Sequence, residues 1–118
     1  MSSSDLVARL EGRLAGLHAE TSGMPRRPSI ACIEWIDAPM LVGNWVPELV
    51  DYARGVDPLG EAGRHSGYLD MAQLVAADPD VIAIMPCGFD IDRAWREMPA
   101  LVDRPECSSC PPCAAGGW

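Results

Sequence analysis

The chain has 118 residues, 48% of them hydrophobic, and a formal net charge of −8 from 17 acidic and 9 basic residues. That length suffices for one small domain, and the acidic balance disfavours a nucleic-acid partner because it repels the phosphate backbone. No apolar stretch approaches the roughly 20 residues of a membrane span. Residues 1–5 also lack the basic start and apolar core of a signal peptide. We therefore expect a cytoplasmic chain with no direct membrane insertion.

A stripe of leucines predicts an amphipathic helix over residues 3–21. The stripe consists of Leu6, Leu10, Leu14 and Leu17. These spacings place all four side chains on one face of a helix. Ser4 or Asp5 is expected to cap its start, and Gly23 and Pro25 follow its end, as is common at helix stops.

Two short β-branched runs predict strands that are buried on both faces. They cover residues 29–34 and 80–85, and a helical pattern follows each of them. Alternation of strand and helix predicts a parallel sheet. We therefore expect an α/β fold, a partial Rossmann-like lobe with few parallel strands flanked by helices. Ligands of such sheets sit outside the carboxyl ends of the strands, where Trp35 and Phe89 fall.

The segments between these strands are predicted to hold helices and loops. Residues 38–43 and 57–67 are rich in turn-forming residues and are expected to be loops. Helices are expected over residues 45–53 and 71–77, and a third begins after Asp90. Their expected caps are Asn44, Asp70 and Asp90.

The last segment, residues 104–118, has no apolar period and is expected to be irregular. It contains a formal metal-binding motif, formed by Cys107, Cys110 and Cys113. Thiolates at this spacing bind zinc or iron–sulfur clusters, but a full site normally needs a fourth ligand. An accidental run of cysteines is the favoured interpretation, and a metal-binding or redox tail is kept as the alternative.

Several motifs resemble the C-terminal lobe of a cobalamin-type (class III) substrate-binding protein of ABC importers. The motifs are Ala31-Cys-Ile-Glu-Trp35, Gly43-Asn-Trp-Val-Pro-Glu48, Ala76-Ala-Asp-Pro-Asp-Val-Ile82 and Met85-Pro-Cys-Gly-Phe-Asp90. The resemblance implies two α/β lobes joined by a long helix, with a corrinoid in the cleft between them. By this resemblance, residues 3–22 are the end of the interlobe linker helix and residues 28–103 are an incomplete C-terminal lobe. We expect a fragment that binds a corrinoid weakly or not at all by itself.

The resemblance also implies the kind of activity and partner. The protein would be non-enzymatic and would require no cofactor, with cobalamin as its ligand and the membrane subunits of an ABC importer as its partners. Relatives often carry a docking glutamate where this chain reads Asp70-Met-Ala-Gln-Leu74, which weakens the expectation of docking through this lobe. Members of the family are often periplasmic or attached to the cell surface.

Five residues are the candidates for ligand contact: Trp35, Trp45, Cys87, Gly88 and Phe89. Large flat side chains give a broad apolar ring contact area at low entropic cost, and backbone amides near Gly88 could bind a carbonyl or an anion. The aromatic residues could equally serve core packing. A nucleophilic Cys87 is not expected, because neither His18 nor His65 has a visible orienting partner. Ferric-siderophore or haem binding is the alternative function.

Overall fold

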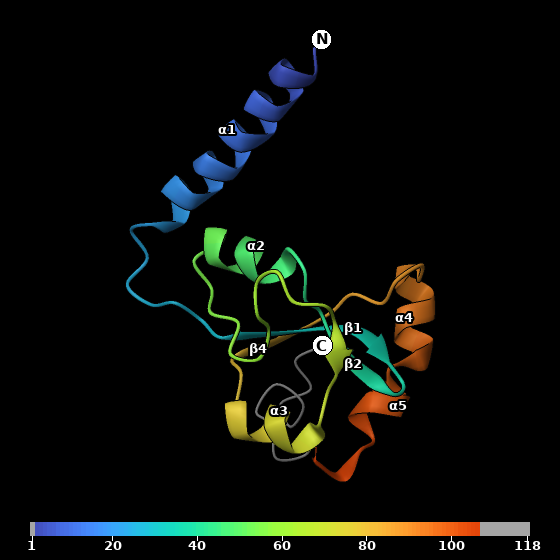
Figure 1. Ribbon diagram of the computed structural model, residues 1–118. Coiled ribbons are helices and arrows are strands. Elements are labelled where there is room, and N and C mark those ends of the chain that lie inside the picture. The colour runs from blue at the N-terminus through green and yellow to red at the C-terminus, as the bar shows by residue number, and fades with distance from the viewer. Residues whose placement is uncertain (1, 107–118) are drawn as a thin grey trace.

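The computed structural model describes residues 2–106, which form a four-stranded mixed sheet with helices around it (Figure 1). The strands are β1 (Ile30–Ile36), β2 (Pro39–Leu41), β3 (Gly67–Tyr68) and β4 (Val81–Ile84). Their order in the sheet is β3-β2-β1-β4, with β1 and β4 parallel and the other neighbours antiparallel. The predicted class, a partial α/β lobe, is confirmed.

The two antiparallel strands are a correction to the sequence analysis. Residues 38–43 and 57–67 were expected to be loops, yet they contain β2 and the first residue of β3. Strands this short provide too few residues for a two-residue period to be recognised. In addition, the first residue of β2 is Pro39, and proline disfavours a strand prediction because it has no backbone N–H to donate to a neighbouring strand. Pairing with the long strand β1 is what makes this segment extended.

Five helices accompany the sheet in the described part of the chain. They are α1 (Ser3–Thr21), α2 (Val46–Tyr52), α3 (Met71–Ala77), α4 (Ile91–Glu97) and α5 (Pro99–Val102). The caps predicted for α3 and α4 are confirmed. The Asp70 carboxylate accepts from the Ala72 amide at 3.0 Å, and the Asp90 carboxylate accepts from the Arg93 amide at 2.8 Å.

Two predicted caps are wrong. Helix α1 is capped by Ser2, whose hydroxyl accepts from the Asp5 amide while the Asp5 carboxylate accepts from the Ser2 amide, both at 3.2 Å. This reciprocal pair is a capping box, so Asp5 acts from the third helical position. Before α2, Asn44 is in the left-handed region with φ 57° and Trp45 is the cap residue, without a side-chain cap bond. The Asn44 amide donates instead to the Arg64 carbonyl at 2.5 Å.

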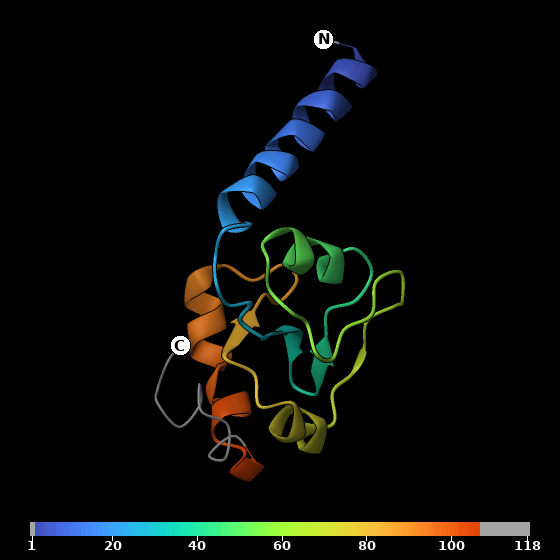
Figure 2. The ribbon, with the colours of Figure 1, turned by 90° about the vertical axis from the view of Figure 1, so that its left-hand side faces the viewer.

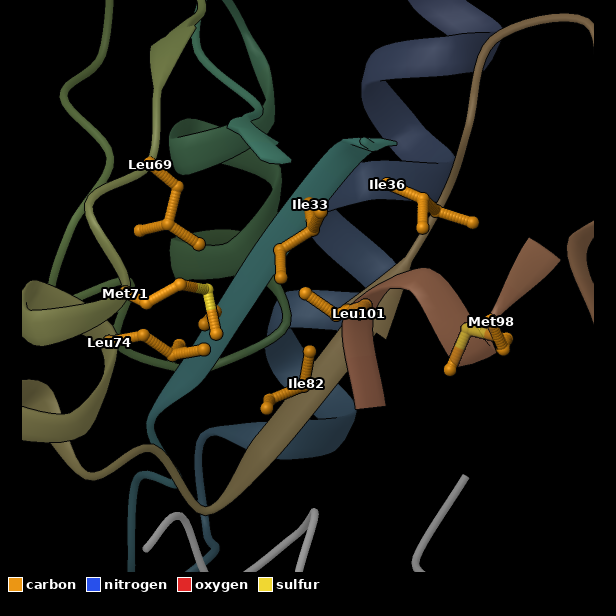
Figure 3. Packing of buried hydrophobic residues seen from close by; sticks show 9 residues of the cluster. Ile33, Ile36, Leu69, Met71, Leu74, Ile82, Met98 and Leu101 are labelled. Carbon is orange, nitrogen blue, oxygen red and sulfur yellow. The ribbon is translucent and has the colours of Figure 1, made fainter. Parts of the chain in front are cut away.

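Strand β1 is buried on both faces, as its near-continuous apolar run predicted, but the same prediction is wrong for β4, where Val81 is exposed because β4 is the last strand in the sheet order. Alternate residues of β1 enter two clusters: Ala31 and Ile33 join the larger, whereas Cys32 packs with Val50 of α2. The larger cluster comprises Ala31, Ile33, Ile36, Leu69, Met71, Leu74, Ile82, Met98 and Leu101 (Figure 3). Helices α3 and α5 therefore cover one face of β1, and α2 covers the other.

Helix α1 extends away from the rest of the described chain (Figures 1 and 2). None of its residues is buried, and the leucine stripe is exposed at Leu6, Leu10 and Leu17. Near its end, the His18 ring meets the Tyr52 ring of α2 edge to face, with centroids 6.1 Å apart. Within residues 2–106, no helix is both long and apolar enough to cross a membrane. The division of the chain into linker helix, incomplete lobe and tail stays a prediction.

Candidate functional site

Trp35 and Phe89 lie together where the parallel strands β1 and β4 end. Their rings meet edge to face, with centroids 5.4 Å apart and planes inclined at 67°. Both side chains line a pocket of about 300 Å³. The structure thus places these two candidates in one concave site, as their positions near the strand ends predicted. Trp35 is itself a residue of β1 rather than of the turn that follows.

Local structure explains how Phe89 reaches this pocket. The Met85 amide donates to the Ile33 carbonyl at 2.8 Å, which ties the end of β4 to β1. Gly88 then adopts a positive φ of 77°, a conformation that glycine takes without a steric penalty. This turn brings the chain back to Asp90, the cap of α4, and leaves Phe89 packed against the large hydrophobic cluster.

Helix α4 contributes charged side chains to the lining of the pocket. The Arg93 guanidinium lies over the Phe89 ring at 3.9 Å from its centroid, within the range of a cation–π contact. Arg93 also pairs with Glu97 at 3.7 Å, and Asp37 pairs with Arg104 at 3.6 Å. Arg96 lines the pocket too, and no ion pair joins it to another residue within 2–106. The pocket therefore combines an aromatic pair with an arginine, Arg96, that has no acidic partner among the described residues.

Three of the five ligand candidates lie outside this pocket. Trp45 is 70% exposed at the start of α2, the helix that covers the other face of β1 from α3 and α5. Cys87 and Gly88 are exposed in the turn before Phe89, and neither lines the pocket. The structure therefore does not unite them with Trp35, and a role for them in ligand contact stays a prediction.

Arg93 and Arg96 are the pocket residues that the sequence analysis missed. They are three positions apart on α4, so they lie on neighbouring parts of one helical face. Both arginines follow shortly after Phe89, a predicted site residue, and after Asp90, the cap of α4. This spacing is the signal that could have identified them. Asp37 also lines the pocket, and its carboxylate forms an ion pair with Arg104.

A second pocket, of about 380 Å³, lies between β2 and the segment before β3. Its charged lining residues Glu61 and Arg64 already pair with each other at 2.6 Å. Nearby, the buried Cys32 thiol has a pKa raised to about 11, first by burial and then by the charge of Asp57. A thiol in this state is protonated at neutral pH, so Cys32 is not an activated nucleophile.

Metal binding finds no support in residues 2–106, where no group of three or more His, Cys, Asp or Glu side chains is arranged to hold an ion. The candidate motif of Cys107, Cys110 and Cys113 lies outside the described residues. The proposal of a metal-binding tail is therefore still an expectation from the sequence.

Comparisons with known proteins identify no relative: no family model, no curated protein and no solved structure matches this chain significantly. The resemblance to cobalamin-binding lobes therefore rests on the motifs alone.

Proposed function

We propose that the pocket at Trp35 and Phe89 forms one wall of a corrinoid-binding site, in a protein that serves ABC-type import. The observation that carries this proposal is the aromatic pair at the carboxyl ends of the two parallel strands, with an open pocket beside it. A corrin ring is broad and largely apolar, with amides on its rim. A half-exposed indole offers such a ring a flat contact, and the neighbouring polar groups can orient the amides.

The size of the pocket supports weak binding by this chain alone. Pockets that enclose a drug-sized ligand usually measure about 300–1,000 Å³, and this one is about 300 Å³. A corrinoid is larger than such a ligand, so most of its surface would stay in water against a single wall. Tight binding would need a second wall from another lobe. We therefore expect a dissociation constant above about 1 μM, which corresponds to a binding free energy weaker than about −8 kcal/mol.

The lining residues favour a corrinoid over haem. Protein-bound haem iron takes an axial ligand from histidine, cysteine, methionine or tyrosine. None of the described residues that line the pocket is of these types. The nucleotide loop of cobalamin supplies the lower axial base of its cobalt, so this site would only need to contact the ring and its rim.

Spectrophotometric titration of the full chain with cobalamin tests the proposal. We expect saturable binding in the micromolar to millimolar range and at least tenfold weaker binding by Trp35→Ala. Trp95→Ala is the matched control, because Trp95 is exposed on α4 and does not line the pocket. Absence of saturation up to about 1 mM, or equal losses in both variants, would refute the proposal. Submicromolar affinity would contradict the single-wall argument.

A further inference from the structure

We propose that Arg96 makes this site selective for planar ligands that carry a carboxylate on the rim. The inference rests on the proposed function, because it names the ligand chemistry of the same pocket. It extends that function from an uncharged corrinoid to an acidic one, and it makes Arg96 the residue that determines the preference.

The charge balance of the pocket is the first argument. The acidic lining residues Asp37 and Glu97 are each paired with an arginine, at 3.6 and 3.7 Å. Arg96 lines the same pocket without an ion pair to any other residue in the range 2–106. With Arg104 counted as the partner of Asp37, three arginines accompany two carboxylates, so Arg96 is left without an acidic partner among the described residues of this neighbourhood. A ligand with a negative rim would neutralise it.

The placement of the arginines is the second argument. Arg93 is held against the Phe89 ring at 3.9 Å and by Glu97, so its guanidinium is already engaged. Arg96 lies three residues further along the same face of α4 and lines the same pocket as the aromatic pair. A ring bound in this pocket would share it with the Arg96 guanidinium. A guanidinium can bind a carboxylate there through two parallel hydrogen bonds.

The preference should be modest and sensitive to salt. Arg96 is exposed, and ion pairs in water are weak and screened by electrolyte. We expect a rim carboxylate to tighten binding about threefold to fivefold at low ionic strength, and the advantage to shrink as salt is added.

Two ligands that differ by one charge provide the test. They are cobalamin and a monocarboxylic acid derivative of it, in which one side-chain amide is hydrolysed. The readout is the ratio of their dissociation constants for the full chain, measured by the same spectrophotometric titration. We expect a ratio of about three to five for the natural sequence, about one for Arg96→Gln, and an intermediate value for Arg96→Lys. Arg13→Gln is the control, because it makes the same change of net charge on the exposed helix α1.

Two of the three contrary outcomes overturn this inference without overturning the proposed function. Equal affinities of the natural chain for both ligands would overturn the role of Arg96 and leave corrinoid binding intact. A preference that persists in Arg96→Gln would also overturn it, because the charge would then act through another residue. If neither ligand binds, the proposed function fails and this inference fails with it.

Discussion

Asp80 and Ser29, which directly precede β4 and β1, are joined by reciprocal hydrogen bonds. The Asp80 carboxylate accepts from the Ser29 amide at 2.8 Å and from its hydroxyl at 3.2 Å, and the Ser29 hydroxyl accepts from the Asp80 amide at 2.9 Å. Arg26 adds an ion pair to the same carboxylate at 2.5 Å. These contacts hold in register the one parallel strand pair in the described chain, whose opposite end carries the candidate pocket.

The Asp80 contacts predict a loss of stability in acid. The amide of Ser29, and then the Arg26 side chain, lower the pKa of the Asp80 carboxyl below its usual value near 4. A lowered folded-state pKa contributes stability above the unfolded pKa, and this contribution disappears as the pH falls through the folded pKa. We expect Asp80→Asn to melt below the natural chain at neutral pH, with the gap closing below about pH 4. Thermal melts followed by circular dichroism measure this, with the exposed Glu11→Gln as control. A gap that does not depend on pH would contradict it.

Truncation of Leu101 should be far more costly than truncation of Leu17. Leu101 of α5 is 0% exposed within the large cluster, whereas Leu17 of α1 is 53% exposed. Leu101→Ala should lower the free energy of unfolding by about 2–5 kcal/mol, because it removes buried methyl groups and leaves a cavity. Leu17→Ala should change it by less than about 0.5 kcal/mol. Urea denaturation measures both values, and similar losses would show that α1 is packed against something.

The same glycine-to-alanine change should act in opposite directions at two positions. A Cβ on Gly43 would collide with the backbone carbonyl of Arg64 and lie 2.9 Å from backbone atoms of His65 and Ser66. Gly43→Ala should therefore destabilise the fold by about 1–3 kcal/mol. Gly12 has nothing within 4 Å and lies inside α1, so Gly12→Ala should stabilise that helix by about 1 kcal/mol. Melting temperature and helical content report the two effects, and a stable Gly43→Ala chain would refute the close approach.

The two free cysteines of the described chain should react at different rates. Cys87 is exposed, whereas Cys32 is buried and the pKa of its thiol is raised to about 11. Because the thiolate is the reactive form, maleimide at about pH 8 should label Cys87 quickly and Cys32 only after unfolding. Peptide mass mapping with and without denaturant distinguishes the two sites. Rapid labelling of Cys32 in the folded chain would show that its surroundings open.

Helices and strands whose formation depends mainly on residues close in the sequence could be predicted. The β-branched runs identified β1 and β4, and the aspartates at positions 70 and 90 identified the starts of α3 and α4. The strands β2 and β3 were missed because three or two residues have no readable period, and their extended form depends on pairing with another strand. The cap of α1 was misplaced because Ser2, Ser4 and Asp5 are all acceptable cap residues, and only the capping box distinguishes them.

Reading the sequence was enough to place Trp35 and Phe89 near the ends of two parallel strands, because apolar runs and helix caps depend on residues that are close in the chain. Which side chains lie beside this aromatic pair could be seen only in the folded chain. Side chains of β1 point alternately to its two faces. Helix α2, with Trp45 at its start, therefore packs on the face opposite to α3 and α5. Helix α4 instead brings Arg93 and Arg96 beside Trp35 and Phe89. Which residues share a pocket depends on strand pairing and on the face that each helix covers, and these are contacts between distant parts of the chain.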